Sequence, residues 1–252
     1  MTVAVTGLCV AAGWTSTSLA VGVIAVFTGQ LSVGWSNDAH DAHIDRAQGR
    51  RSKPVVQGIV SPETLWRAAV GAVVVCVPTS LLAAGWGGTF QLLGVAAAWG
   101  YNVRWSRTTW SWLPYLVAFA AIPAYVTLGS PAATWPAGWL VVVLASVGVA
   151  AHLANALRDR DIDARTSSGG VVTSLGPTPA RWLAVVLLGL ASLILMSVTW
   201  PQWWAVMVAG GAAAVVVALA LVVGDGVFFR ALMIGCLVDL VVIMAADVPL
   251  TA

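Results

Sequence analysis

Long apolar stretches separated by shorter connections constrain this chain more than any other feature of its sequence. Nine such stretches can be delimited, at residues 2–14, 16–37, 65–85, 88–103, 112–128, 136–157, 180–199, 202–223 and 227–247. Most approach the roughly 20 residues that a helix needs to cross a bilayer. Hydrophobic residues make up 60% of the chain and charged residues 9%, and the apolar runs are continuous rather than alternating, which excludes a water-soluble core and a membrane β-barrel. The sequence therefore predicts an all-α, polytopic membrane protein, a nine-helix transmembrane bundle that forms a single domain over residues 1–252.

The positive charges indicate how this bundle is oriented. All twelve Lys and Arg residues lie in or beside connections that follow an even-numbered stretch: Arg46, Arg50, Arg51, Lys53, Arg67, Arg104, Arg107, Arg158, Arg160, Arg165, Arg181 and Arg230. Connections that follow an odd-numbered stretch carry none. Because cytoplasmic loops are enriched in Lys and Arg, we expect a multi-pass protein of the cell membrane whose cation-rich end faces the cytoplasm and whose C-terminus lies outside.

The first stretch is shorter than the others. Residues 2–14 are too few to cross a bilayer, and no basic region precedes them as it would in a signal peptide. The sequence favours a truncated first helix whose beginning is encoded upstream of Met1.

Two acidic clusters at the ends of apolar stretches hold six of the ten acidic residues, one of which, Asp161, points away from the face that the other members of its cluster share. Carboxylates are costly beside hydrocarbon, so this concentration is difficult to explain by packing. A helix presents the members of the first cluster within an arc of about 100°; they are Asn37, Asp38, Asp41 and Asp45. The second cluster shares one helix face at positions i, i+4 and i+8; its members are Asn155, Asp159 and Asp163. Both clusters lie at the cation-rich end.

The two clusters are candidate sites for a hard cation. Oxygen donors without cysteine suit Mg2+, and His40 and His43 point away from the first acidic face. Mg2+ usually joins one or two carboxylates to phosphate oxygens, so two facing clusters predict a two-metal diphosphate clamp. We expect all seven Asn and Asp residues of the clusters to be metal ligands. The catalytic ones among them would be Asp38, Asp41, Asp159 and Asp163.

Other residues at this end are candidates for contact with the substrate, namely Arg46, Lys53, Tyr101, Asn102, His152 and Arg165. The cations among them could neutralise phosphate charge, and the aromatic and amide side chains at the end of the fourth stretch could line a cavity. His152 lies one helical turn deeper than Asn155 and could touch a headgroup. A buried, hydrogen-bonded histidine fits the sequence equally well.

A diphosphate held at the rim of an apolar bundle, with a hydrocarbon tail inside it, describes a prenyl diphosphate. Metal ions would withdraw charge from the leaving diphosphate, and an apolar cavity would keep water from the carbocation until an acceptor attacks it. The sequence thus predicts Mg2+-dependent transfer of a prenyl group to a lipophilic acceptor.

Two alternatives remain open. A membrane terpene cyclase would use the same metal site, with the prenyl chain attacking itself. A transporter would place charges near the bilayer midplane, where Asp239 is a candidate, although the two clusters at one rim favour catalysis.

The three cysteines, Cys9, Cys76 and Cys236, fall in apolar stretches and are expected to be small buried hydrophobic residues. The expected partners are the two substrates and the bilayer, and no nucleic acid.

The two clusters and their flanking segments resemble the motifs of the UbiA superfamily of intramembrane prenyltransferases. The segments that carry the resemblance are Asn37-Asp38-x-x-Asp41-x-x-x-Asp45-Arg46, Ser52-Lys53-Pro54 with Gly58, Asn155-x-x-x-Asp159-x-x-x-Asp163, Leu175-Gly176, Tyr101-Asn102 and Trp112-Leu113-Pro114-Tyr115. The resemblance covers nearly the whole chain and implies a bundle around a central cavity, Mg2+ dependence and a lipophilic acceptor. The chain departs from many members after the second motif, where residues 167–170 replace a lysine; Arg165 could take its place.

Overall fold

The protein is represented by a computed structural model that describes residues 1–47, 53–165 and 170–252, except for the side chains of residues 161–165. Its helices are α1 (Thr2–Ala11), α2 (Ser16–Ala47), α3 (Pro62–Ala84), α4 (Gly88–Gly100), α5 (Leu113–Leu128), α6 (Gly138–Arg165), α7 (Val171–Leu175), α8 (Pro177–Thr199), α9 (Trp203–Val222) and α10 (Asp225–Ala245). Nine of these match the nine predicted stretches, and the short α7 is an addition that the sequence did not predict. Within the described residues, six stretches are long and apolar enough to cross a membrane, with 62–105 counted as one. The all-α polytopic bundle is confirmed.

Glycine allows α3 and α4 to fold back on each other within this 62–105 stretch. The hydroxyl of Ser61 accepts a hydrogen bond from the backbone N–H of Thr64 at 3.1 Å, which caps the start of α3. The helix ends at Gly85, whose φ of +55° favours glycine. A Cβ on Gly88 would lie 2.2 Å from the backbone carbonyl oxygen of Ser80, so α4 can begin this close to α3 only with glycine.

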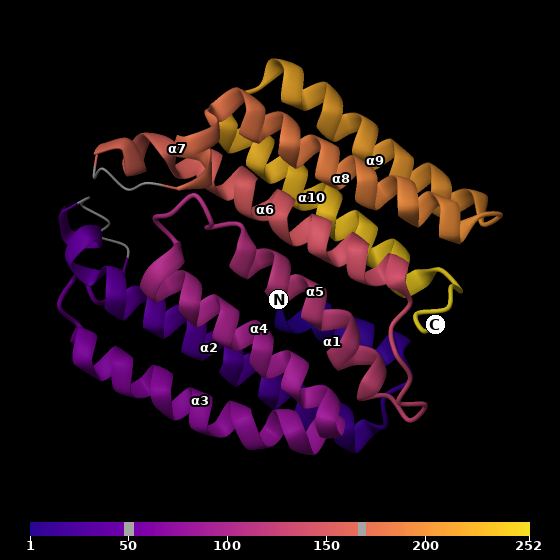
Figure 1. The fold of residues 1–252 in the computed structure, drawn as a ribbon, viewed down its shortest axis with the longest axis horizontal. Coiled ribbons are helices and arrows are strands. Elements are labelled where there is room, and N and C mark those ends of the chain that lie inside the picture. The colour runs from indigo at the N-terminus through magenta and orange to yellow at the C-terminus, as the bar shows by residue number, and fades with distance from the viewer. Residues whose placement is uncertain (48–52, 166–169) are drawn as a thin grey trace.

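The helices form two groups that enclose an interior space. Figure 1 shows α2, α3 and α4 on one side of the bundle, α8, α9 and α10 on the other, and α5 and α6 between them. Helix α5 packs against both α4 and α6, while α1 packs against α2, α5 and α10. In the described part of the chain, the two cluster-bearing helices α2 and α6 do not pack along each other. Helices α2 and α6 are therefore linked mainly through α1, α5 and α10.

Helix α6 is the best anchored of the two cluster-bearing helices. Its side chains Leu140, Leu153 and Leu157 are fully buried, and they belong to one core with Leu188 of α8 and Leu232 of α10. Burial of several leucines fixes a helix because each contributes about 1.5–3 kcal/mol. The second cluster is thus presented from a firmly packed helix.

A π-helical turn at Tyr101–Trp105 ends α4. The turn is closed by a hydrogen bond from the backbone N–H of Ser106 to the carbonyl of Tyr101 at 2.9 Å. The side-chain amide of Asn102 donates to the carbonyl of Val33 at 2.9 Å and to the hydroxyl of Ser36 at 3.0 Å. Since π turns re-aim the residues of a helix, this turn ties α4 to α2 immediately before the first cluster.

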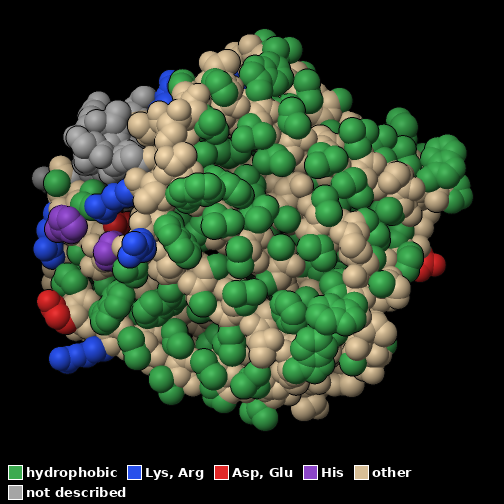
Figure 2. Space-filling model, in the orientation of Figure 1, with side chains coloured by type: hydrophobic (Ala, Val, Ile, Leu, Met, Phe, Trp, Pro, Cys, Tyr) green, Lys and Arg blue, Asp and Glu red, His purple; other side chains and the backbone are tan. Residues whose placement is uncertain are grey.

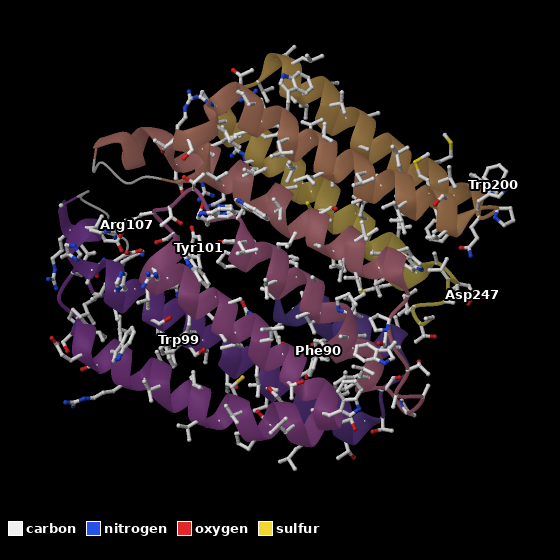
Figure 3. All side chains as sticks on the ribbon, in the orientation of Figure 1. Phe90, Trp99, Tyr101, Arg107, Trp200 and Asp247 are labelled. Carbon is white, nitrogen blue, oxygen red and sulfur yellow. The ribbon has the colours of Figure 1, made fainter. Side chains whose placement is uncertain are left out.

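Charged and apolar side chains are segregated on the surface. In Figure 2 the visible Lys, Arg and His side chains gather along one edge of the molecule, and apolar side chains cover the rest of the face. Large apolar residues such as Leu82, Leu193 and Leu221 are 64–77% exposed, as expected where a protein faces lipid. Trp200 and Asp247 lie at the end opposite Arg107 (Figure 3). The three cysteines are free and buried, as predicted.

Candidate active site

A cavity of about 590 Å³ lies between the two groups of helices, walled by α1, α2, α4, α5, α6 and α7. Residues of both acidic clusters line it: Asn37, Asp38, Asp41 and Asp45 from α2, and Asn155 and Asp159 from α6. The two clusters therefore open on the same space at the same end of the bundle. Asp163 and Arg165 belong to the last turn of α6, and their side chains lie outside the described ones.

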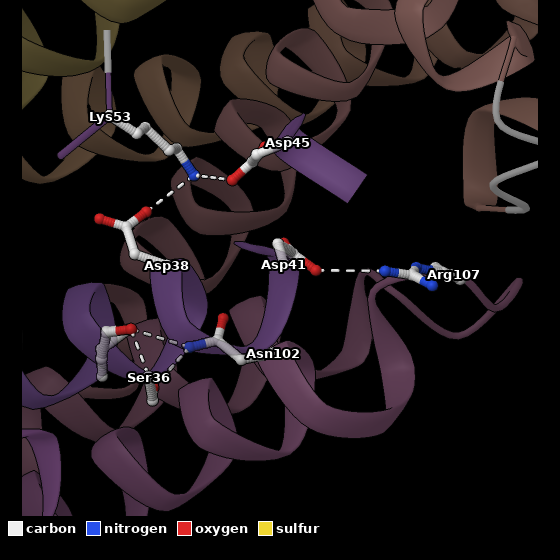
Figure 4. Close-up of polar contacts among 8 residues, drawn as sticks. Ser36, Asp38, Asp41, Asp45, Lys53, Asn102 and Arg107 are labelled. Carbon is white, nitrogen blue, oxygen red and sulfur yellow. Dashed lines mark hydrogen bonds and ion pairs between the residues drawn. The ribbon is translucent and has the colours of Figure 1, made fainter. Parts of the chain in front are cut away.

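Lys53 joins two carboxylates of the first cluster (Figure 4). Its ammonium nitrogen lies 2.7 Å from a carboxylate oxygen of Asp38 and 2.7 Å from one of Asp45. Partial burial acts to lower the pKa of Lys53, but the hydrogen bonds and charges of the two carboxylates outweigh it and leave this pKa raised. Asp45 is 2% exposed and Asp38 31%, so Asp45 holds Lys53 from inside while Asp38 faces the cavity.

Arg107 is a second cation that meets the first cluster. A guanidinium nitrogen of Arg107 lies 3.1 Å from a carboxylate oxygen of Asp41, and both residues line the cavity. Sequence reasoning assigned Arg107 only a topological role. The signal for it was present, because the connection after α4 belongs to the same end as the clusters and follows Tyr101 and Asn102 closely.

Arg158 organises the second cluster. It donates to the carboxylate of Asp159 at 2.9 and 3.1 Å and to the side-chain oxygen of Asn155 at 2.7 Å. The guanidinium lies 4.3 Å above the ring centre of Phe229 in α10, where a cation–π contact holds it. The amide and carboxylate of this face are thus kept together by a cation from their own helix.

An acidic residue outside both clusters holds a further cavity-lining cation. Asp225, at the start of α10, lies 3.2 Å from Arg160 and is also hydrogen-bonded to Arg181. Arg181 in addition donates to the carbonyls of Ala220 and Val223 at the end of α9, at 3.0 and 2.8 Å. Asp225 was missed in the sequence because its partners are 44 and more residues away.

The donor set around the cavity fits Mg2+. Amide and carboxylate oxygens face the space from two helices, and these are the ligands that a hard cation prefers. Among the described residues, no three Asp, Glu, His or Cys side chains form a ready-made metal cage. Mg2+ is usually bound by one or two carboxylates together with waters and substrate phosphates, so such a cage is not required.

The deeper wall of the cavity is aromatic and apolar. Tyr101, Tyr115 and His152 contact one another there, with ring centres 4.4–5.6 Å apart. Phe119 and Ile122 of α5 continue this wall toward the interior. The space therefore offers oxygen ligands and cations at one end and a water-excluding lining at the other.

Several sequence candidates lie elsewhere. Arg46 is exposed, does not line the cavity, and donates to the carbonyl of Val55 at 3.2 Å. His40 and His43 also lie outside the cavity lining, as expected from their helix positions. Asp239 is buried between α10 and α8, where one carboxylate oxygen accepts a hydrogen bond from Ser192 at 2.8 Å.

A polytopic helical bundle with an acid-lined cavity at one membrane end defines an intramembrane enzyme. Its sequence identifies the kind: residues 1–226 match the UbiA prenyltransferase family, and the chain belongs to that family. It is therefore a membrane prenyltransferase. None of the curated proteins is matched by the sequence.

Solved structures show the same fold. A UbiA homologue from Aeropyrum pernix K1, solved in its apo form, is 16% identical, with a TM-score of 0.75 over 95% of each chain. A digeranylgeranylglyceryl phosphate synthase is 12% identical, with a TM-score of 0.70 over 96% of this chain and 91% of that one. A UbiA homologue from Archaeoglobus fulgidus, bound to GPP and Mg2+, is 11% identical, with a TM-score of 0.64 over 94% and 92%.

Proposed function

We propose that the protein transfers a prenyl group from a prenyl diphosphate to a lipophilic acceptor, in a Mg2+-dependent reaction at the cytoplasmic face of the membrane. The observation that carries this proposal is the convergence of the α2 and α6 clusters on one cavity whose deeper wall is apolar. The binding of GPP and Mg2+ by the Archaeoglobus homologue supports it. The collection of Lys and Arg at the same end supports the cytoplasmic orientation.

In this proposal, each cluster supplies oxygen ligands for the Mg2+ that holds the donor diphosphate. Oxygens of Asn37, Asp38 and Asp41 would hold metal from α2, and those of Asn155 and Asp159 would do so from α6. Asp163 would extend this second face, because it follows Asp159 by four residues on the same helix. When bound, Mg2+ would draw charge from the diphosphate as the allylic C–O bond breaks.

The cations at the cavity would bind the rest of the diphosphate. Arg107 and Arg160 line the space and can form charge-assisted hydrogen bonds to phosphate oxygens, and Lys53 adds positive charge beside Asp38. Arg165 is proposed for the same task from its position at the end of α6. Further in, Tyr101 and Asn102 bound the region in which the carbocation would be kept from water.

The test is diphosphate cleavage by the purified protein in nanodiscs. The protein is incubated with Mg2+, prenyl diphosphates of several lengths and a membrane lipid extract, and pyrophosphate and prenylated products are measured. D38N and D159N should each lose about 10³-fold in turnover, since metal ions contribute several kcal/mol to such reactions. Asp247→Asn, at the opposite end of the molecule, is the matched control and should keep full activity.

Two results would contradict the proposal. Full turnover by D38N or D159N would separate the clusters from the chemistry. A cyclic hydrocarbon formed equally well without the lipid extract would replace transfer to an acceptor by cyclisation.

A further inference from the structure

His152 is a polar side chain that the proposed cleavage of the donor does not use. It lies on α6, is 3% exposed and lines the cavity. Its Nε2 atom lies 3.0 Å from the hydroxyl oxygen of Ser111, whereas its Nδ1 atom has no hydrogen-bond partner among the residues that the structure describes. Buried polar atoms are nearly always paired, so this nitrogen requires an explanation.

The contacts of Ser111 favour one position for the proton of the imidazole ring. The hydroxyl oxygen of Ser111 accepts a hydrogen bond from the backbone N–H of Val171 at 3.2 Å. The Ser111 hydroxyl contacts no other acceptor among the described residues, so its hydrogen is used if it donates to Nε2 of His152, with Nε2 as the acceptor. In this arrangement the proton of the neutral ring sits on Nδ1, and His152 would present an N–H donor at the cavity wall.

Aromatic neighbours fix the orientation of this donor. The ring of Tyr115 stacks on His152 with centres 4.4 Å apart and an interplanar angle of 25°. The ring of Tyr101 meets His152 edge-on, at 5.6 Å and 84°. Stacked and edge-to-face contacts of this kind are favourable, and together they form a flat-sided wall around one N–H group.

The position and charge of His152 suit the second substrate rather than the diphosphate. The diphosphate would be met by Lys53, Arg107 and Arg160, whereas His152 lies three residues before Asn155, about 4.5 Å deeper along the helix axis. One neutral N–H donor matches a neutral or weakly charged oxygen, and multiply charged phosphate is better matched by cations.

We propose that His152, held by Ser111, binds the acceptor by donating its Nδ1–H to a carbonyl or phenolic oxygen. The flat walls of Tyr101 and Tyr115 fit an acceptor with a planar, conjugated ring. This inference rests on the proposed function, which supplies the need for an acceptor. It narrows the acceptor class and makes His152 a specificity-determining residue.

Histidine NMR tests the inference directly, because the chain contains only three histidines and the other two, His40 and His43, lie outside the cavity lining. Full-length protein with [15N]histidine in nanodiscs is titrated with 2-naphthol and with 2-methylnaphthalene, which has the same ring without the oxygen. We expect His152 in the Nδ1–H tautomer and a shift of its Nδ1 resonance with 2-naphthol alone. An Nε2–H tautomer, or equal shifts with both probes, would overturn the inference.

The affinities of the two probes provide a second test. His152→Phe should lose about tenfold in its preference for 2-naphthol over 2-methylnaphthalene, the equivalent of one hydrogen bond. His43→Phe, the matched control, should keep the preference of the wild type. An unchanged preference in H152F would overturn the inference, and the titration of the wild type decides it if H152F does not fold. Absence of diphosphate cleavage by the wild type would instead refute the proposed function, so the two failures are distinguishable.

Discussion

A guanidinium nitrogen of Arg107 lies 3.1 Å from a carboxylate oxygen of Asp41, and this ion pair joins the connection after α4 to the acidic face of α2. Arg107 is 42% exposed and Asp41 29%, so the pair is open to the cavity that both residues line. An exposed pair of this kind adds little to folding stability. The proposed function gives the pair a different role: a phosphate oxygen of the donor could replace Asp41 as the partner of the Arg107 guanidinium.

We expect Arg107→Ala to raise the KM for the prenyl diphosphate about tenfold, because one charge-assisted hydrogen bond is lost. Arg107→Lys should fall between wild type and R107A, since lysine keeps the charge but not the planar fork of donors. The measurement is pyrophosphate release against donor concentration. Arg67→Ala removes the same charge from an exposed position on α3 outside the cavity lining, and equal effects of R67A and R107A would contradict the assignment.

Lys53→Met should destabilise the folded protein by about 2 kcal/mol, because Asp45 is 2% exposed and would lose a charged partner. The double variant K53M/D45N should recover more than half of this loss, as removing both charges leaves no buried carboxylate to compensate. Thermal or denaturant unfolding in a mild detergent measures the cycle. Additive losses in the double variant would show that the two residues do not depend on each other.

The raised pKa of Lys53 predicts the pH range of this stabilisation. A lysine whose pKa is higher in the folded state contributes fully below its unfolded value of about 10.4, and the contribution is lost as pH rises through the folded pKa. The stability difference between wild type and K53M should therefore stay constant through neutral pH and shrink only in strong alkali. A difference that disappears near pH 7 would contradict the ion pairs.

We expect Asp225→Ala to raise the donor KM through Arg160, which Asp225 holds from α10. R160A and D225A should raise this KM by similar factors, and the double variant should raise it no further. The reason is that R160A removes the guanidinium, whereas D225A removes the carboxylate that orients the same guanidinium. D225A should also lower the unfolding temperature, since Arg181 loses a partner at the junction of α8, α9 and α10. Multiplicative KM effects in the double variant would separate Asp225 from Arg160.

The orientation in the membrane can be tested with two matched positions. Ile59 lies in the connection between α2 and α3 and is 69% exposed, whereas Trp200 lies at the opposite end and is 71% exposed. In intact cells a membrane-impermeant maleimide should label Trp200→Cys, and it should label Ile59→Cys only after permeabilisation. The native cysteines are buried and should react little. The reverse pattern would place the clusters at the outer face.

The sequence anticipated those features that depend on composition and helical periodicity. Apolar length identified nine of the helices that the structure describes, and Asp38 and Asp41, expected to share one helix face, both line the cavity. The helical arrangement of the first cluster was expected from its spacing, and α2 does continue through the cluster to Ala47, beyond the apolar stretch 16–37. The short α7 has too few residues for periodicity to be detected.

Features that depend on distant pairing could not be predicted. Lys53 was expected to meet phosphate, and its ion pairs with Asp38 and Asp45 require the chain to turn back after α2. Asp239 had no explanation in the sequence because its partner Ser192 is 47 residues away on α8. Arg46 was a candidate by proximity in sequence alone, whereas its side chain leans toward Val55.

The separation of α2 from α6 has a consequence for the order of events during turnover. A donor that spans both clusters would connect α2 directly with α6, two helices that the fold otherwise links through α1, α5 and α10. The first substrate would thus complete part of the enclosure in which the second one reacts. Such an architecture would favour binding of the donor before the acceptor.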